Sequence, residues 1–453
     1  MKRMPMAARF AAPLVLVAAV AAPLTTRAVV ARGSTGVRAV TGGQAGPGTS
    51  GHWVDSWVAA PQLTEPGNMP PPPFTRNNLV FPDSTLRQTI HVSIGGQKTR
   101  LRFSNAYGGT DLPITAVSVA RPAGGQAGVS AIQPGTSQAV RFGGQPSIDI
   151  PVGAQAVSDP LNLPVAPQSN LTVTMYLAAG QASGNITSHP GSRTTSYMVA
   201  GNHLDDADLT GAASADHWYF LSGAEVWSGP RTEAVTVVGD SLTDGRGSTT
   251  NRNDRWTDQL FGRLQSIPAT AGVAVLNQGL GGNRVLQDGL GPNVLARLDR
   301  DVLAATGAKW MILFEGVNDI GTADATPAAQ KQISSELIGG YEQIIVRAHA
   351  MGIAVYGATI TPFGGNTMYD DPNGYREAAR QTVNQWIRTS HLFDAVLDFD
   401  KAARDPANPR DILPAFDSGD HLHLNPAGYK ALADAVPAGL FEGAPPSPGG
   451  GFN

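Results

Sequence analysis

The chain has 453 residues, of which 42% are hydrophobic and 15% are charged, and its formal net charge at pH 7 is −4. This length predicts about two domains with sizeable cores. The low charge and the lack of any run of Lys or Arg argue against a nucleic-acid-binding protein. The sequence contains no cysteine, which excludes disulfides, thiol nucleophiles and thiolate metal sites.

Residues 1–31 have the layout of a secretory signal peptide. Lys2 and Arg3 give a positive start, and a short apolar run over 10–24 is followed by small residues. The run is too short to cross a bilayer comfortably, although an uncleaved membrane anchor is the alternative. We expect a secreted protein with no stable membrane anchor after cleavage. A flexible leader rich in Gly, Ser, Thr and Ala is expected over 32–51.

Residues 52–230 have the pattern of a β-rich accessory domain. Apolar and polar residues alternate over 90–94 and again over 101–103, and Gly95-Gly96-Gln97 lies between them, which predicts a hairpin. Further short strands are expected at 147–150, 171–177 and 196–199. Gly, Pro and Asn separate these strands, and no long helical period appears. An all-β sandwich or jelly roll is typical of such a pattern.

After residue 231 the predicted strands alternate with helices. Strands are expected at 234–238, 273–276, 310–314, 354–356 and 395–397. Helices are expected at 256–264, 294–303, 327–351, 375–390 and 426–435. This alternation predicts an α/β domain over 231–441, with a parallel sheet that binds its ligand beyond the carboxyl ends of the strands. A Pro- and Gly-rich disordered tail is expected over 442–453.

A serine follows the first of these parallel strands, in Gly239-Asp240-Ser241-Leu242. At this place a tight turn can expose the hydroxyl of Ser241, although a serine that only caps a helix is equally compatible with the tetrapeptide. A serine hydroxyl becomes a good nucleophile only when a base accepts its proton. Of the candidate bases, His349 lies within a helical pattern and His391 at a helix end, so both are interpreted as helix-surface or capping residues.

A more suitable base lies in the loop before the last helix. Asp420 and His423 are three residues apart, so one turn of chain can bring the carboxylate to the imidazole ring. Such a carboxylate fixes the tautomer of the ring and stabilises the imidazolium. His421 is an alternative base, but its neighbour Asp420 faces away from it more easily, so we favour His423. A polar loop that merely caps the helix is the structural alternative.

Two further loops offer donors for an oxyanion. Residues 277–284 follow the second strand and are rich in Gly, which permits close approach of a backbone N–H to a ligand. Residues 315–319 follow the third strand, and Asn318 there can present a side-chain N–H without a charge. Either loop alone is an ordinary turn. Four such loops at one edge of a parallel sheet predict an acyl-transfer site.

Taken together, the four loops resemble the SGNH (GDSL-type) hydrolase family. The matching blocks are Gly239–Leu242, Gly281–Asn283, Gly316–Asp319 and Asp420–His423, and the resemblance covers about residues 233–437, less than half of the chain. It implies a three-layer α/β/α sandwich with a parallel, flavodoxin-like sheet.

The resemblance also implies roles for single residues. The catalytic triad would be Ser241, Asp420 and His423. The oxyanion hole would consist of the backbone N–H groups of Ser241 and Gly282 and the side chain of Asn318. Because two glycines are adjacent in this block, Gly281 stays an alternative to Gly282.

The family implies hydrolysis of carboxylic esters through an acyl-enzyme, without a metal or another cofactor. We expect short acyl chains, on a small-molecule or polysaccharide ester; a carbohydrate esterase acting on acetylated polysaccharide and a lipase are the alternatives. A catalytically inactive, secreted glycan-binding protein is the alternative from another class. The acidic stretch 370–374 is interpreted as a surface turn, because further ligands of a calcium loop are missing.

Tryptophans of the β-rich domain bear on the glycan-binding alternative. Four of them could stack on sugar rings: Trp53, Trp57, Trp218 and Trp227. Burial in the core is the commoner place for such side chains and is the interpretation that we favour.

Overall fold

The computed structural model describes residues 50–443. The predicted signal peptide, nearly all of the predicted leader and most of the predicted tail lie outside the described residues. Within the described range, no helix combines the length and the apolar character that crossing a membrane requires.

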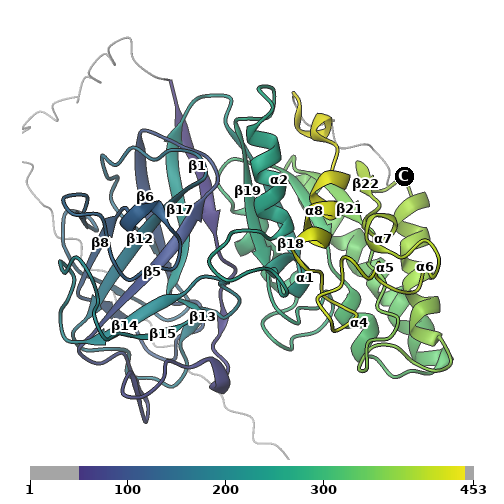
Figure 1. Ribbon diagram of the computed structural model, residues 1–453, viewed down its shortest axis with the longest axis horizontal. Helices are drawn as coiled ribbons and strands as arrows, with labels where there is room; N and C mark the ends of the chain where they lie inside the picture. Colours follow the sequence, from purple (N-terminus) through teal and green to yellow (C-terminus); the bar gives the residue numbers. More distant parts are fainter. Residues whose placement is uncertain (1–49, 444–453) are drawn as a thin grey trace, which may run out of the picture. The chain divides into compact units, whose positions relative to one another are not determined.

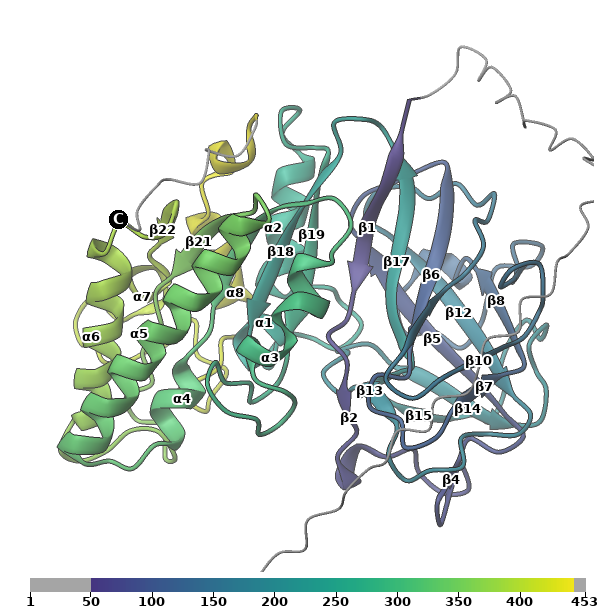
Figure 2. The ribbon, with the colours of Figure 1, turned by 180° about the vertical axis from the view of Figure 1, so that it is seen from behind.

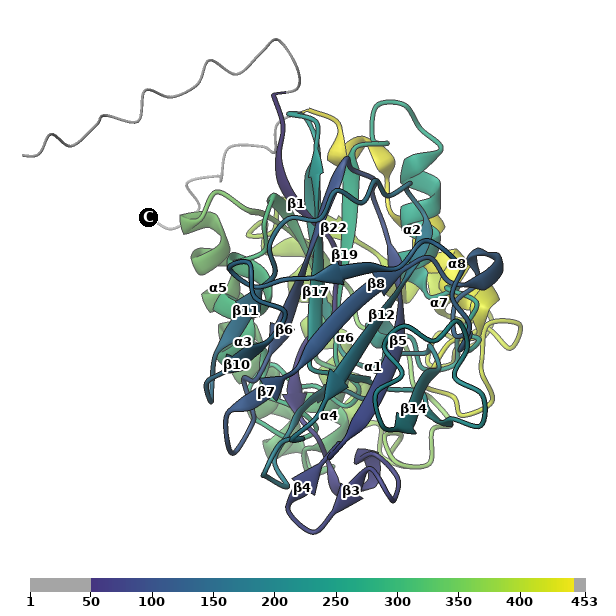
Figure 3. The same ribbon diagram turned by 90° about the vertical axis from the view of Figure 1, so that its left-hand side faces the viewer.

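Two antiparallel sheets form the β-rich part of the chain (Figure 1). The first has the order β1 (His52–Val58), β17 (Leu221–Ser228), β6 (Lys98–Ser104), β11 (Gln155–Val157). The second has the order β15 (Ala213–Ala215), β14 (Ser196–Ala200), β5 (Ser84–Val92), β12 (Ser169–Leu177), β8 (Ala116–Ala120), β9 (Gln138–Val140). Their buried apolar side chains belong to one hydrophobic core, and in the face-on view of Figure 3 strands β8, β12 and β5 of the second sheet lie in front of β17 of the first. The predicted all-β sandwich is therefore confirmed.

Smaller elements complete this part. Short strands form three small sheets: β10 (Ile148–Ile150) with β7 (Leu112–Ile114); β16 (Trp218–Tyr219), β13 (Thr187–His189) and β2 (Gln62–Leu63); and β3 (Thr75–Arg76) with β4 (Leu79–Val80). Short 3₁₀ helices lie at Pro66–Asn68, Ala123–Gly125 and, near the end of the chain, Ala438–Phe441. The strands predicted at 147–150, 171–177 and 196–199 correspond to β10, β12 and β14.

The predicted hairpin around residues 95–97 is wrong, although both of its strands exist. β5 pairs with β12 and β14, whereas β6 pairs with β17 and β11, so the two strands belong to different sheets. The turn carries the chain across the sandwich, and Gly96 forms a bridge with Val165 on the way. A Cβ at Gly95 would lie 2.6 Å from the Val165 carbonyl oxygen, so glycine is needed for this approach. The alternation of apolar and polar residues predicted the two strands, but it did not predict which strands they pair with.

A five-stranded parallel sheet forms the second part of the chain. Its order is β19 (Val273–Gly279), β18 (Glu233–Gly239), β20 (Ala308–Phe314), β21 (Ala354–Ala358), β22 (Ala395–Leu397). The strands are buried along almost their whole length, as expected for a sheet covered on both faces. The sheet architecture changes between β17 and β18, yet residues 50–443 belong to one compact unit, so the division into two domains stays a prediction.

Over residues 50–443, eight α-helices follow or connect these strands. They are α1 (Ser241–Asp244), α2 (Trp256–Gln265), α3 (Val294–Leu298), α4 (Val317–Thr322), α5 (Pro327–Ala350), α6 (Tyr375–Thr389), α7 (Phe399–Ala403) and α8 (Pro426–Ala435). Helices α2 and α8 lie in front of the sheet in Figure 1, and α5 lies in front of it in the reverse view of Figure 2. The predicted three-layer α/β/α arrangement is confirmed. The helix predicted at 294–303 changes at Asp299 from α3 into a π-helical turn that ends at Leu303.

Strand β1 connects the two parts of the chain by packing on β19. The backbone N–H of Asp55 donates to the Thr306 carbonyl (3.0 Å), and the Asp55 carboxylate accepts from the Thr306 N–H (2.8 Å). Arg102 donates to Asp55 (2.8 Å) and to Glu225 (2.7 Å) in the same buried cluster. We call Asp55, Arg102, Glu225 and Thr306 the polar joint.

The four tryptophans of the β-rich part divide into two pairs. Trp57 and Trp218 are buried and contact each other edge to face, as the core interpretation predicts. Trp53 and Trp227 are only half-buried and form a second edge-to-face pair, with the Arg100 guanidinium over the Trp53 ring.

Candidate active site

Ser241 is the first residue of α1, directly after β18. The carboxylate of Asp240 accepts the backbone N–H of Leu242 (2.9 Å) and so caps the short helix. A Cβ at Gly239 would lie 2.6 Å from the Phe314 carbonyl oxygen of β20, which explains the glycine at the end of the strand. The turn places a serine that is 7% exposed at the carboxyl edge of the parallel sheet.

The loop before α8 brings His423 to this serine. The Oγ atom of Ser241 lies 2.7 Å from Nε2 of His423, and Nδ1 of His423 lies 2.6 Å from Oδ2 of Asp420. Since a carboxylate only accepts, Nδ1 carries the proton and Nε2 is left to accept from the serine hydroxyl. Asn425 caps α8 by accepting the N–H groups of Ala427 and Gly428, as predicted for the start of this helix.

The alternative base lies elsewhere. His421 is 56% exposed, and its Nδ1 atom lies 2.6 Å from the carboxylate of Asp417. The structure therefore brings Ser241, His423 and Asp420 into one hydrogen-bonded chain and leaves His421 out of it.

Hydrogen bonds keep Asp420 ionised. Burial alone would raise its pKa, but the carboxylate accepts from the His423 ring and from the backbone N–H groups of Leu422 (3.1 Å) and His423 (2.8 Å). These bonds outweigh burial and hold the pKa of Asp420 below its ordinary value. The carboxylate is thus fixed both in position and in charge.

The second and third loops lie against each other beside the serine. The side-chain N–H₂ of Asn318, in α4, donates to the Asn283 carbonyl (2.8 Å), and its Oδ1 accepts from the Tyr369 hydroxyl (2.6 Å). These two bonds define the orientation of the amide, and a second N–H on the same nitrogen can serve an oxyanion. Gly282 has φ +71°, the left-handed region that favours glycine, whereas Gly281 does not.

Asp319 fastens the same two loops together. Its carboxylate accepts the backbone N–H groups of Val285 (2.9 Å) and Leu286 (3.1 Å), just beyond the glycine block. Burial raises the pKa of Asp319 to about 6, against the lowering effect of these bonds. Two neighbouring carboxyl groups are also perturbed: burial raises the pKa of Asp240 to about 7 and that of Glu315 well above its ordinary value.

Sequence reasoning missed two residues that support these loops. Tyr369 lies in the long loop after β21 and belongs to no motif; its ring packs on Gly321 of α4, which a Cβ would prevent. Arg297 in α3 is fully buried and donates to the Gln278 carbonyl (2.7 Å) and to Oδ1 of Asn283 (3.0 Å). The only sequence signal for Arg297 is a charged residue at an inward position of a helical pattern.

The acidic stretch at 370–374 forms a turn that begins α6. Asp371 accepts the backbone N–H groups of Asn373, Tyr375 and Arg376, and these bonds hold its pKa below the ordinary value although burial opposes them. Asp370 pairs with Arg410 (3.0 Å). Within residues 50–443, no group of three or more His, Cys, Asp or Glu side chains is placed to hold a metal ion.

Comparison with known proteins gives a family match over this part of the chain. Residues 237–431 match the model of the GDSL-like lipase/acylhydrolase family. An acetylxylan esterase of Geobacillus stearothermophilus is 24% identical over 223 residues, which is 45% of this chain and 91% of that protein.

Similar solved structures also cover less than half of the chain. A lipolytic protein of the G-D-S-L family from Desulfitobacterium hafniense, described as putative, is 21% identical, with a TM-score of 0.34, over 45% of this chain and 97% of that one. The Geobacillus stearothermophilus acetylxylan esterase gives 22% identity and a TM-score of 0.33, over 45% and 91%. The strands from β1 to β17 lie outside the family match. On the family match, residues 237–431 form a GDSL-like lipase and acylhydrolase domain, of the SGNH hydrolase kind, and the protein is a serine hydrolase of ester bonds.

Proposed function

We propose that Ser241 is the nucleophile of this hydrolase, that His423 is its general base and that Asp420 orients and stabilises the base. The observation that carries the proposal is the continuous hydrogen-bonded chain from the Ser241 hydroxyl through both nitrogens of His423 to the Asp420 carboxylate. This order of groups can remove the serine proton as the hydroxyl attacks a carbonyl carbon.

The reaction has two halves. In the first, Ser241 attacks the ester carbonyl, His423 accepts the serine proton, and the same proton passes to the leaving alcohol, which leaves an acyl-serine. In the second, His423 takes a proton from water, the resulting hydroxide attacks the acyl-serine, and the acid departs while Ser241 regains its proton. The negative oxygen of each tetrahedral intermediate is assigned to the N–H groups of Ser241, Gly282 and the Asn318 side chain.

For the substrate we propose esters with short acyl chains, with acetyl groups on a polysaccharide as the natural source. The similarity to an acetylxylan esterase supports this choice. Leu290 lies beside the proposed donor Gly282, since a Cβ there would lie 2.7 Å from the Leu290 side chain. Action outside the cell, through the predicted signal peptide at 1–31, is part of the same proposal.

The first experiment is turnover of p-nitrophenyl esters of increasing acyl length, with Ser241→Ala as the control. We expect activity to be highest on the acetate and to vanish in Ser241→Ala, while thermal unfolding of the variant matches that of the wild type. Activity that rises with chain length would favour a lipase over a deacetylase. Full turnover by Ser241→Ala would overturn the assignment of the nucleophile, and no turnover of any ester by the wild type would favour the glycan-binding alternative.

Asn318→Ala tests the oxyanion assignment. Loss of one donor to the developing oxyanion should lower kcat by about 10²–10³-fold and leave KM nearly unchanged, because the bond is made mainly in the transition state. Asn408→Ala, at an exposed asparagine of the same part of the chain, is the matched control and should keep its activity. A change in KM alone would show that Asn318 only binds substrate.

A further inference from the structure

Asp244, the last residue of α1, takes its side-chain partners from the β-rich part of the chain. The carboxylate is 2% exposed. Its Oδ1 atom lies 3.0 Å from Nε2 of His189 in β13, and its Oδ2 atom accepts from Arg193 (3.0 Å). The chain at Gly191 passes directly over the carboxylate, with no room for a Cβ. All three partners lie outside the residues of the family match.

Contacts on both ring nitrogens and on the ring face hold His189 in place. Its Nδ1 atom lies 3.0 Å from the Ala60 carbonyl oxygen, and its Nε2 atom faces Asp244, so both ring nitrogens face acceptors. Since a carboxylate only accepts, Nε2 donates to Asp244. The ring is stacked on Trp218, with 5.6 Å between centroids and 29° between planes. His189 is thus a buried ring held on three sides.

The electrostatics of Asp244 agree with this arrangement. Burial alone would raise the pKa of Asp244, but the positive charges of Arg193, His189 and Arg255 outweigh it and hold the pKa below the ordinary value. Arg255 also links the backbone of the β-rich part to that of the second part. It donates through Nε to the Asp244 carbonyl (2.9 Å) and through Nη2 to the Ser192 carbonyl.

On its other side Asp244 contacts the glycine loop. A Cβ at Gly281 would lie 3.6 Å from Oδ2 of Asp244, and at Gly279 the end of β19 passes so close to the Asp244 backbone that a Cβ cannot fit. Asp244 therefore lies between the turn that carries Ser241 and the loop that carries Gly282. A displacement of the Asp244 backbone would therefore be passed to the end of β19, from which the glycine loop begins.

We propose that His189 and Arg193 are positioning residues of the ester hydrolase, which act through Asp244 to set the distance between Ser241 and the glycine loop. The β-rich part is then an integral piece of the catalytic unit and not an independent binding module. The inference rests on the proposed roles of Ser241 and Gly282. It predicts that changes in the β-rich part alter the chemical step.

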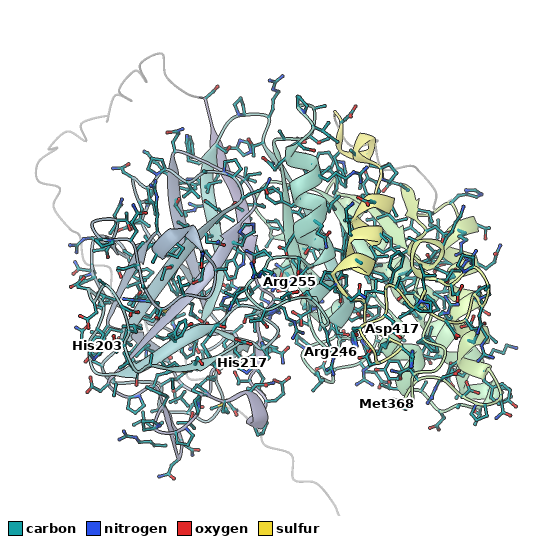
Figure 4. The ribbon with its side chains drawn as sticks, in the orientation of Figure 1. His203, His217, Arg246, Arg255, Met368 and Asp417 are labelled. Carbon is teal, nitrogen blue, oxygen red and sulfur yellow. The ribbon has the colours of Figure 1, made fainter. Side chains whose placement is uncertain are left out.

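His189→Leu is the main test, with His203→Leu as its matched control. His203 has the same pair of partners as His189, a carboxylate (Asp206, 2.7 Å) and a backbone carbonyl (Ala200, 3.0 Å), but it lies at the surface, far from Arg255 in Figure 4. With p-nitrophenyl acetate we expect kcat of His189→Leu to fall about 10- to 100-fold with KM nearly unchanged, since small displacements of reacting groups cost this much. His203→Leu should keep the wild-type kcat.

A single covalent reaction of Ser241, without turnover, measures the reactivity of the nucleophile separately from the later steps of the reaction. A p-nitrophenyl phosphonate forms a bond from phosphorus to the Ser241 oxygen, releases p-nitrophenolate, and leaves the serine proton on His423. We expect the rate of this single step to fall in His189→Leu in parallel with kcat. His189→Gln, which keeps one N–H for Asp244, should recover part of both rates. A merely structural role would lower the midpoint of thermal unfolding, Tm, but leave kcat per titrated Ser241 unchanged.

Arg193→Met keeps the test decisive if His189→Leu does not fold. Arg193 is 30% exposed, so its replacement disturbs the core less, and we expect the same fall in kcat with a smaller loss of stability. Wild-type kcat per titrated serine in every variant that folds would overturn the inference while leaving the hydrolase intact. A wild-type protein whose Ser241 does not react with the phosphonate would instead overturn the proposed function.

Discussion

Three carboxyl groups, those of Asp240, Glu315 and Asp319, are buried around the loops of the site and interact with one another. Burial raises the pKa of each, and their mutual repulsion adds to the effect for Asp240 and Glu315. Asp240 has a structural use for its oxygen, since it caps α1. The cap requires an oxygen that accepts the Leu242 N–H, but it does not require that the Asp240 side chain be charged.

The substitution Asp240→Asn keeps a side-chain oxygen that can accept the hydrogen bond at the start of α1, but it removes the ionisable carboxyl group. The folded protein holds the Asp240 proton up to about pH 7, whereas the unfolded chain releases it near 3.8. Between these values the folded state binds more protons, so the stability of the wild type falls as pH rises through this window. We expect the Asp240→Asn variant to match the stability of the wild type near pH 4 and to exceed its Tm increasingly toward pH 8. A Tm difference that does not vary with pH would contradict the raised pKa.

At the residue scale, the sequence indicated the groups with a recognisable motif and missed those without one. Ser241, His423, Asp420 and Asn318 occur in short blocks at strand ends, and the structure places them at one edge of the sheet. Tyr369 could not be found, because its use depends on a loop that packs across α4.

At the scale of elements, the close approach of β19 and α1 depends on a glycine. A Cβ at Gly279 would collide with the backbone at Thr243 and Asp244, which cannot rotate away as a side chain can. We expect Gly279→Ala to lower stability by about 2 kcal/mol or more and to lower kcat, because the turn that bears Ser241 must move. Urea unfolding and turnover of p-nitrophenyl acetate measure the two effects.

Gly339→Ala is the matched control for this change. Gly339 lies within α5, and a Cβ there meets nothing within 4 Å. Alanine should stabilise the protein by about 0.5–1 kcal/mol, because glycine is a poor helix former, and should leave kcat unchanged. Equal effects of the two substitutions would show that the contact at Gly279 is unimportant.

Helices and strands were predicted well wherever the local periodicity of apolar residues defines them. The end of α5 differs from the prediction by one residue, and β22 and α8 agree with it. Pairing was not predictable in the same way. The partners of β5 and β6 follow from the packing of distant segments in the sandwich, which alternation within one segment does not encode.

At the scale of the whole molecule, the polar joint couples the two parts of the chain. Arg102 balances two buried carboxylates in it, and burial already raises the pKa of Asp55 to about 6. Arg102→Leu leaves Asp55 without its cation and should lower stability by about 3–5 kcal/mol. Arg141→Leu, at an exposed arginine of the same part, is the control and should change little.

Two probes report whether the parts unfold together. Circular dichroism at 222 nm follows mainly α2, α5, α6 and α8, all in the second part, whereas tryptophan fluorescence follows both parts. We expect the two curves to coincide in the wild type and to shift together in Arg102→Leu. Separate transitions would show that the parts fold independently.

The pairing of β1 has a consequence for synthesis of the chain. β1 is the first of the described strands to leave the ribosome, yet its only neighbour within the sheet is β17, the last strand of the β-rich part, and the strand on which it packs, β19, follows later still. Until then it is an unpaired edge, with apolar residues free to associate with other chains. The nascent protein is therefore open to association through this edge until β17 is made, and stalls before β17 should produce aggregates.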